Sequence, residues 1–157
     1  MRAARYNTGV TLSKFPIADM HVFPLDRAAG RLTLLRNNDH LLRRFGQLDL
    51  LDLAAGDRQA FTLRGEADRF LFAIGGQVTV VLQDLRETSP TRGARAGVAL
   101  KADQPQGLLV PFGVACSLTA ESPARIIQLS THSETHPLDR TVSAEELDLV
   151  RPGGSIR

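Results

Sequence analysis

The sequence predicts a single-domain, all-β protein built as one β-barrel, and three observations carry that prediction. Short β-rich runs separated by turn residues recur along most of the chain, a pattern typical of a β-sandwich or barrel rather than of alternating strands and helices. The 157 residues are enough for one domain with a sizeable core. The sequence shows no internal repeat, so we expect one barrel and not two.

The strongest β signal is the stretch at 68–84, D-R-F-L-F-A-I-G-G-Q-V-T-V-V-L-Q-D. Its two runs, 70–74 and 78–82, are rich in β-branched and aromatic residues and flank the pair Gly75-Gly76. Glycine adopts the positive φ angles of a tight two-residue turn without steric cost. We therefore expect a β-hairpin that turns at these two glycines.

The other elements are expected in order along the chain. Residues 1–25 form an N-terminal arm, in which Phe15-Pro16 and Phe23-Pro24 favour extended segments at a sheet edge. The barrel spans residues 26–140 and includes one helical turn at 40–44. Its further strands are expected at 31–36, 47–53, 58–64, 96–100, 107–112, 116–120 and 125–131.

A short helix and a tail, residues 141–157, follow the barrel. Ser143 and Glu146 form a capping box, in which the serine oxygen accepts a backbone N–H and the glutamate side chain reaches back. The helix is expected at about 144–150, because Pro152-Gly153-Gly154 cannot continue it.

Composition and charge limit the class of protein. Hydrophobic residues make up 43% and charged residues 23%, as in ordinary globular proteins. The net charge of +2, without a dense Lys/Arg run, argues against a nucleic-acid partner. No apolar stretch approaches the roughly 20 residues that cross a bilayer, and no secretory signal is recognisable, so no membrane association is expected. The single cysteine, Cys116, excludes an internal disulfide, and we expect a cytoplasmic protein.

Glycine spacing resembles the first motif of the cupin barrels. The cupin pattern G-x5-H-x-H-x3-E-x6-G begins at Gly56 and ends at Gly75. Its three metal-ligand positions are occupied by Thr62, Arg64 and Asp68. The resemblance implies a jelly-roll β-barrel in which the ligand histidines are replaced.

The second cupin motif, P-x-G-x2-H, is met by P-F-G at 111–113 with Cys116 in place of the histidine. An arginine at a ligand position repels a cation, so the resemblance implies no metal and no other cofactor. A metal-dependent cupin oxygenase, the third function considered, is therefore nearly excluded.

A closer resemblance runs through residues 26–140. The segments D-L-R at 84–86, S-P-T at 89–91 and L-V-P at 109–111 look like those of dTDP-4-dehydrorhamnose 3,5-epimerase. That family carries R-G-E-V, then D-L-R with S-P-T-x-G, then W-I-P-x-G-F-A-H-G. The stretch A-D-R-F-L-F-A-I-G-G-Q at 67–77 also resembles dTDP-hexose 3,4-ketoisomerases, which are sister cupins.

The resemblance implies that the groups for ligand binding are better retained than the groups for proton transfer. The resemblance implies that Thr62 and Arg64 stand at the histidine positions, and neither a hydroxyl nor a guanidinium gives up a proton near neutral pH. The lysine that helps hold phosphate becomes Arg69, which keeps the charge, and the tyrosine acid falls near Gln128. We expect the ligand to contact Thr62, Arg64, Arg69, Cys116 and Gln128.

Each candidate has a plainer alternative. His132, near the position of the family's late aspartate, is the candidate acid–base group, and Asp68 is a candidate carboxylate. Their sequence context favours a plainer interpretation of Asp68 and Glu66 as turn residues or ion-pair partners. Arg64 and Arg69 could be solvated side chains on outward strand positions. Cys116 could be a small buried hydrophobe.

Two functions stay open. The first is an epimerase or isomerase acting on a dTDP-4-keto-6-deoxyhexose type of sugar nucleotide, in deoxysugar or polysaccharide biosynthesis, with a rearranged acid–base set. The second is a sensor or accessory cupin that binds a small ligand without turning it over. Cupins of this kind pair through N-terminal strands, so the resemblance also implies a homodimer formed by residues 1–25.

Overall fold

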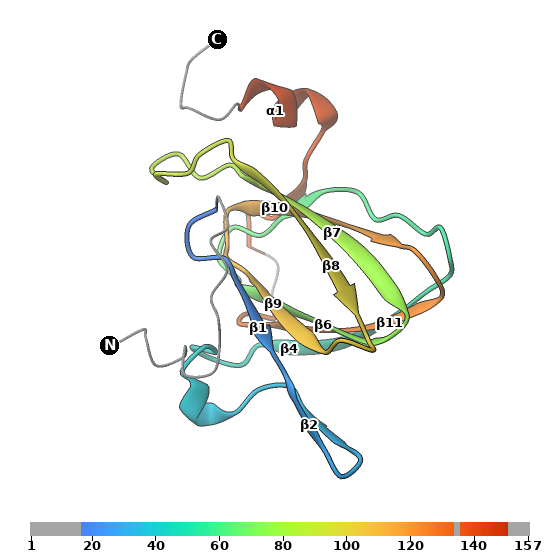
Figure 1. Ribbon diagram of the computed structural model, residues 1–157. Helices are drawn as coiled ribbons and strands as arrows, with labels where there is room; N and C mark the ends of the chain where they lie inside the picture. The colour runs from blue at the N-terminus through green and yellow to red at the C-terminus, as the bar shows by residue number, and fades with distance from the viewer. Residues whose placement is uncertain (1–16, 134–135, 151–157) are drawn as a thin grey trace.

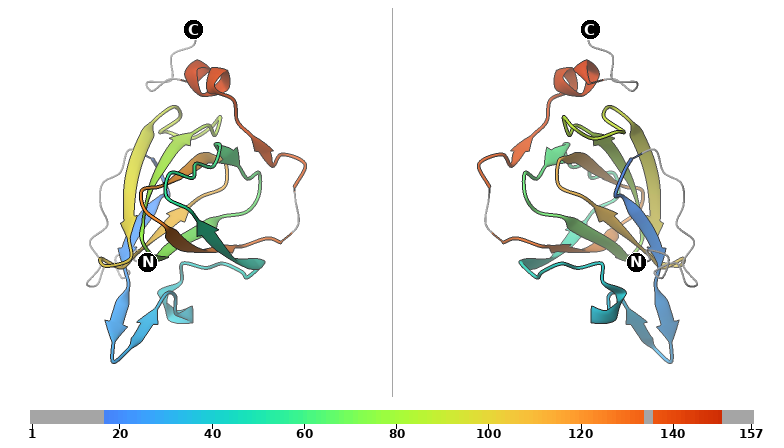
Figure 2. Two further views of the ribbon diagram at one scale, coloured as in Figure 1. Left: turned by 90° about the vertical axis from the view of Figure 1, so that its right-hand side faces the viewer. Right: turned by 90° about the vertical axis from the view of Figure 1, so that its left-hand side faces the viewer.

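The computed structural model describes residues 17–133 and 136–150. Two five-stranded antiparallel sheets face each other and form one jelly-roll barrel, which confirms the predicted fold class (Figures 1 and 2). The expectations for residues 1–16 and 151–157 lie outside the described residues. In the described part no helix has the length and apolar character to cross a membrane.

Both sheets contain strands that are distant in sequence. The first sheet has the order β1 (His21–Pro24), β9 (Gln106–Val110), β6 (Arg69–Gly75), β11 (Ala124–Ser130) and β4 (Gln47–Leu53). The second has the order β12 (Arg140–Thr141), β5 (Thr62–Leu63), β10 (Val114–Ala120), β7 (Gln77–Asp84) and β8 (Arg95–Lys101). A small ribbon of β2 (Asp26–Ala28) and β3 (Arg31–Thr33) projects from the barrel at the end opposite the helix (Figure 1).

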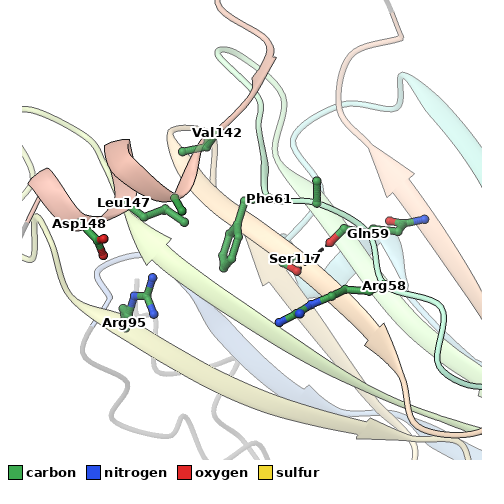
Figure 3. A pocket seen from close by; sticks show the side chains of 10 residues that line it. Arg58, Gln59, Phe61, Arg95, Ser117, Val142, Leu147 and Asp148 are labelled. Carbon is green, nitrogen blue, oxygen red and sulfur yellow. Dashed lines mark hydrogen bonds between the residues drawn. The ribbon is translucent and has the colours of Figure 1, made fainter.

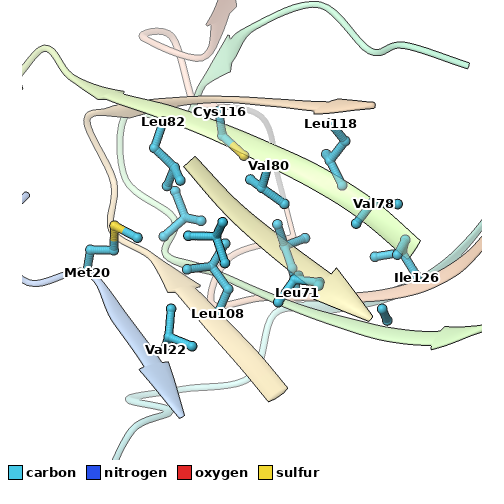
Figure 4. Packing of buried hydrophobic residues seen from close by; sticks show 14 of the residues in the cluster. Met20, Val22, Leu71, Val78, Val80, Leu82, Leu108, Cys116, Leu118 and Ile126 are labelled. Carbon is cyan, nitrogen blue, oxygen red and sulfur yellow. The ribbon is translucent and has the colours of Figure 1, made fainter. Parts of the chain in front are cut away.

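The barrel interior is apolar because alternate residues of every long strand point inward. Leu71 of β6, Val80 of β7, Leu118 of β10 and Ile126 of β11 belong to one buried cluster between the sheets (Figure 4). Burying a side chain of this kind contributes about 1.5–3 kcal/mol, so this cluster is the main source of stability.

The outer face of the first sheet carries a second cluster. Phe70 and Phe72 of β6 point outward and are fully covered. Phe23 packs edge-on against Phe72, with ring centroids 6.2 Å apart. Leucines of the segment 25–42 complete the cover. β1 lies within the predicted N-terminal arm, and its pairing with β9 is part of the first sheet.

The expected hairpin at Gly75-Gly76 is wrong. β6 pairs with β9 and β11, whereas β7 pairs with β8 and β10, so the two glycines carry the chain from one sheet to the other. Gly76 has a φ of +70°, and a Cβ there would lie 2.1 Å from the Pro123 carbonyl oxygen. Glycine is needed at this corner, but for a sheet crossing rather than a hairpin turn.

The expected helical turn at 40–44 is also wrong. The chain instead forms a 3-10 turn at Asn37–Asp39, one step earlier. The Asp39 carboxylate accepts the Arg36 N–H at 2.9 Å, and the left-handed conformation of His40 ends the turn. The hydrogen bond of the Asp39 side chain to the backbone therefore determines where the 3-10 turn forms.

The helix α1 (Ala144–Leu149) forms at the expected place. Ser143 Oγ accepts the Glu146 N–H at 3.2 Å, as a capping box requires, but the Glu146 carboxylate pairs with Arg140 instead of reaching back. At the other end, Gln83 donates to the carbonyl oxygens of Leu147 and Val150 at 2.8 and 2.7 Å. These contacts fix α1 over the outer face of the second sheet.

The D-L-R and S-P-T segments form a buried network that ties the start of the described chain to the barrel. Asp84 has no exposed side-chain surface and accepts from Arg86 at 2.9 Å and from Ser89 and Thr91 at 2.6 Å. Arg86 also donates to the Ala18 carbonyl oxygen at 2.8 Å. These two motifs are therefore structural in this chain.

Candidate ligand-binding site in the barrel

The strands bring the predicted site residues to one end of the barrel, the end at which β6 and β10 begin and β11 ends. We call it the site end. On β10, Cys116 stands opposite Thr62 of β5. On β6, Arg69 stands opposite Ser130 of β11. Because Arg69 precedes the inward-facing Leu71 by two residues, its side chain points into the barrel.

Arg69 joins the two sheets at this end. Its Nη1 donates to Thr62 Oγ1 at 2.9 Å, and its Nη2 donates to the Thr62 carbonyl oxygen at 3.2 Å and to that of Val114 at 3.4 Å. Only 5% of Arg69 is exposed, so it is not a solvated side chain on an outward strand position. Thr62 and Arg69 are held together by two of these hydrogen bonds.

The Arg69 charge is incompletely compensated. Among the described residues no carboxylate forms an ion pair with it, and its Nε has no hydrogen-bond partner. Burial lowers the pKa of Arg69 from its ordinary value, against the opposing effects of Cys116 and Asp139. A buried cation without a counter-ion is costly, so this end of the barrel favours an anion.

Arg64 supplies a second guanidinium beside the first. Its Nε donates to Asp139 Oδ2 at 3.1 Å, and 21% of its side chain is exposed. Asp139 also accepts the backbone N–H groups of Gly65 at 2.7 Å and His136 at 2.9 Å. Burial raises the pKa of Asp139, but these hydrogen bonds and Arg64 outweigh it and lower the pKa. A fixed carboxylate therefore orients Arg64.

Cys116 lies in the interior cluster with 1% of its surface exposed (Figure 4). Burial raises the pKa of its thiol, and the nearby Arg69 acts in the other direction. The plainer alternative of a buried small hydrophobe fits this placement, since a raised thiol pKa opposes nucleophilic chemistry.

His132 and Asp68 lie at the loops that close the site end. Thr131 Oγ1 accepts the Asp68 N–H at 3.0 Å and lies 2.9 Å from His132 Nδ1, while His132 Nε2 is 3.6 Å from Glu66. Asp68 accepts the Phe112 N–H at 3.0 Å and the Arg43 Nε–H at 3.1 Å. His132 is thus an oriented imidazole beside a carboxylate, whereas both oxygens of Asp68 hold neighbouring loops.

Gln128 occupies an inward position on β11, two residues after Ile126. It stands opposite Leu71 of β6 on one side and Asp49 of β4 on the other. Its amide therefore faces the same interior as Arg69, one step of the strand pleat away.

A hollow of about 500 Å³ lies on the other side of the second sheet, beneath α1 (Figure 3). Phe61, Ser117 and Leu147 line it, with Arg58, Arg95 and Asp148 around them (Figure 3). Its lining residues Phe61 and Ser117 are the outward neighbours of Thr62 and Cys116 along the strands. It is therefore separated from the barrel interior by the sheet itself.

The described residues show no cluster of three or more histidine, cysteine, aspartate or glutamate side chains able to hold a metal ion. The site end contains guanidinium, hydroxyl, thiol and amide groups together with the Asp139 carboxylate. Chemically this arrangement binds anions, and proton transfer depends on groups at its edge.

Two site features are not evident from the sequence. Asp139 lies 75 residues from Arg64, and nothing in the pattern P-L-D at 137–139 indicates the contact. Gly46 lets the chain pass the end of β11, because a Cβ there would lie 2.4 Å from the His132 backbone. The break in the β pattern before residue 47 is the sequence signal for Gly46.

The two facing sheets, with the two arginines at the site end, define the class of protein: an epimerase-like cupin. The chain belongs to the dTDP-4-dehydrorhamnose 3,5-epimerase family, since a model of that family matches residues 61–149. It is also similar to the spore coat polysaccharide biosynthesis protein SpsL of Bacillus subtilis (strain 168). The two are 36% identical over 102 residues, which are 64% of this chain and 68% of SpsL.

Solved structures show the same fold at low sequence identity. A dTDP sugar isomerase from Desulfovibrio desulfuricans G20 is 22% identical with a TM-score of 0.79, over 86% of this chain and 92% of that one. NovW, a 4-keto-6-deoxy sugar epimerase from Streptomyces spheroides, is 20% identical with a TM-score of 0.77, over 94% and 82%. The Bacillus anthracis dTDP-4-dehydrorhamnose 3,5-epimerase, solved with TDP and PPi bound, is 18% identical with a TM-score of 0.76, over 86% and 85%.

Proposed function

We propose that the protein binds a dTDP-4-keto-6-deoxyhexose type of sugar nucleotide in its barrel and epimerises or isomerises it, in deoxysugar or polysaccharide biosynthesis. The observation that carries this proposal is the pair of guanidiniums at the site end, where Arg69 is buried with an unpartnered Nε. The names of SpsL and of the solved relatives support the class of substrate and the pathway.

A pyrophosphate suits these two arginines. Guanidinium groups form paired, charge-assisted hydrogen bonds with phosphate oxygens, and such bonds are about twice as strong as neutral ones. Arg64 forms an ion pair with Asp139 through its Nε. Asp139 carries one negative charge, whereas Arg64 and Arg69 together carry two positive charges. A bound anion would therefore neutralise the remaining positive charge. Thr62, Cys116 and Gln128 complete the proposed contact set.

We propose that proton transfer is carried out by residues outside the family's histidine positions. In our proposal Thr62 and Cys116 stand where the family has histidines, and neither exchanges protons readily near neutral pH. His132 is the proposed acid–base group, supported by its contact with Thr131 and its proximity to Glu66. Asp68, with both oxygens engaged, is proposed only to position the loops at the site end.

The alternative is a sensor or accessory cupin that binds the sugar nucleotide without converting it. The observation in its favour is that Arg69 donates to Thr62, so the residue in the family's base position is committed to holding a side chain. The two functions share the binding site and differ in proton exchange.

Binding is tested by calorimetric titration with dTDP and with a dTDP-4-keto-6-deoxyhexose. We expect Arg64→Gln and Arg69→Met to weaken binding about tenfold to a hundredfold, the effect of losing one or two charge-assisted contacts. Arg125→Gln is the matched control, because Arg125 lies exposed on β11 and pairs with Asp52. Absence of binding by the wild-type protein at millimolar ligand would contradict the proposal.

Turnover is tested by deuterium wash-in at the carbons beside the ketone. Wash-in by the wild type that is retained in Arg125→Gln supports the enzyme, and loss of the inverted product in His132→Ala supports the acid–base role of His132. Tight binding without wash-in supports the accessory cupin. Each result selects one of the two functions.

We further propose that the protein is a homodimer held by residues 1–25. Apolar residues in this arm, such as Val10, Leu12 and Phe15, are too many for a free tail, and sheet edges are best covered by pairing. Light scattering should give twice the chain mass of 17.1 kDa. A monomer at micromolar concentration, or a dimer unaffected by deletion of residues 1–16, would count against this arrangement.

A further inference from the structure

We propose that Asp49 is the proton acceptor that removes hydrogen from the carbon beside the keto group of the bound sugar. This inference rests on the proposed function and adds a catalytic residue to the same site. Removal of that proton needs a basic group facing the barrel interior, and in our proposal Thr62 and Arg64 stand at the histidine positions of the related cupins. Four observations about β4 point to Asp49.

The first is the alternation along β4. Leu51 and Leu53 pack against the interior cluster. Leu48 and Leu50 lie on the outer face with 58% and 51% of their surface exposed. Since successive side chains of a strand point to opposite faces, Asp49 shares the inward face with Leu51.

The second is the register of β4, β11 and β6. Asp49 stands opposite Gln128, and Gln47 stands opposite Ser130, which in turn stands opposite Arg69. Neighbouring strands lie about 4.8 Å apart, so the backbones at Asp49 and Arg69 are separated by two strand spacings, roughly 10 Å, and one step along the pleat. Both side chains face the interior side of the same sheet.

The third is the chemistry of the carboxylate. Gln47 Nε2 donates to both Asp49 oxygens, at 3.2 and 3.0 Å. This neutral amide orients the group without neutralising its charge. The residue is partly buried, neither sealed in the core nor fully solvated.

The fourth is the contrast with the other carboxylates near the site end. Asp68 pairs with Arg43, Asp84 with Arg86 and Asp139 with Arg64. Within residues 17–133 and 136–150 no cation pairs with Asp49. Its oxygens are held by the neutral Gln47 amide and stay available to accept a proton.

In the proposed step, the C–H bond beside the ketone breaks and its proton forms an O–H bond with an Asp49 oxygen. The electron pair of the C–H bond moves onto the keto oxygen and gives an enolate. Positive potential from the two arginines stabilises that developing charge. Asp49 then returns a proton to the same carbon, or exchanges it with solvent first. Inversion needs a second group on the other face, the role proposed above for His132.

The matched variants are Asp49→Asn and Asp52→Asn. Both lie on β4, but Asp52 is on the outer face, where it pairs with Arg125 at 2.8 Å. Binding of dTDP by calorimetry and deuterium wash-in on a dTDP-4-keto-6-deoxyhexose are measured for both. We expect Asp49→Asn to bind dTDP within about threefold of wild type and to lose wash-in at least about a hundredfold, as general-base catalysis requires. Asp52→Asn should keep both properties, and Asp49→Glu should retain measurable wash-in.

The outcomes separate this inference from the proposed function. Unchanged wash-in in Asp49→Asn overturns the role of Asp49 and leaves the enzyme standing. Equal losses of binding and wash-in assign Asp49 to ligand binding and also overturn it as the base. Wild-type binding without any wash-in overturns it in favour of the accessory cupin. Failure of the wild type to bind dTDP contradicts the proposed function itself.

Discussion

The Arg69 guanidinium donates to both the side-chain and the main-chain oxygen of Thr62, at 2.9 and 3.2 Å. Arg69 lies in the first sheet and Thr62 in the second, so these bonds fasten the two sheets at the site end. Because both residues belong to the proposed ligand contact set, we expect binding and stability to be coupled here.

Thr62→Val should lower the free energy of unfolding by about 1–3 kcal/mol. Valine keeps the shape of threonine but removes the acceptor of Arg69 Nη1, and a buried charged donor without a partner is costly. Thr79→Val is the control: Thr79 Oγ1 donates to Glu121 at an exposed position, and the expected change is within about 0.5 kcal/mol. Urea unfolding measures both, and equal effects would contradict this view of Thr62.

Gly76→Ala should destabilise the protein by about 3 kcal/mol or more. The added Cβ meets the Pro123 carbonyl oxygen at 2.1 Å, and the φ of +70° is unfavourable for alanine. At Gly97 on β8 an added Cβ would have no atom within 4 Å, so Gly97→Ala should be neutral or slightly stabilising. Thermal unfolding of the pair tests whether the sheet crossing depends on Gly76 in particular.

The sequence predicts the strands well because their signal is local. Alternation and β-branched residues are properties of neighbouring positions, and they place β4, β8, β10 and β11 within a few residues. Pairing is not local, so the Gly75-Gly76 corner resembles a hairpin in the sequence although β6 and β7 belong to different sheets. A tight turn and a sheet crossing make the same demand on the backbone, namely a positive φ.

Several candidate residues lie together at one end of the barrel, but their contacts could not be predicted. Cupin spacing singles out Thr62 and Cys116, the epimerase resemblance singles out Arg69, and all three lie at the site end. Asp139 could not be predicted, because its contact with Arg64 arises from how a loop 75 residues away closes over β5. The inward position of Asp49, in contrast, follows from the sequence, because alternation along 47–53 assigns it to the same face as Leu51 and Leu53.

We expect the free energy of unfolding to decrease at acid pH because Asp84 becomes protonated. Burial raises the pKa of Asp84, but hydrogen bonds from Arg86, Ser89 and Thr91 outweigh burial and bring the pKa down to about 2. A group whose folded pKa is lowered stabilises the fold above its unfolded pKa, near 3.9, and loses that contribution as the pH falls toward the folded value. We expect a loss of about 2 kcal/mol between pH 4 and pH 2.

Asp84→Asn should remove this part of the pH dependence and destabilise the protein at neutral pH. Asp52→Asn is the control, since that carboxylate forms an exposed ion pair with Arg125. Urea midpoints across pH 2–7 give the slopes. If the slope below pH 4 is the same in wild type and Asp84→Asn, the buried network is not the source of acid sensitivity.

The last prediction concerns the coupling between Arg64 and Asp139. Asp139 holds the Nε of Arg64 at 3.1 Å and also accepts the Gly65 and His136 backbone N–H groups. Asp139→Asn should therefore misplace the guanidinium and weaken dTDP binding nearly as much as Arg64→Gln, about tenfold. Because both changes act through one guanidinium, the double variant should be hardly weaker than either single variant. Calorimetric titration of the four proteins gives the coupling energy directly. Additive losses would mean that Asp139 affects the ligand by a route other than Arg64, and the orienting role would be wrong.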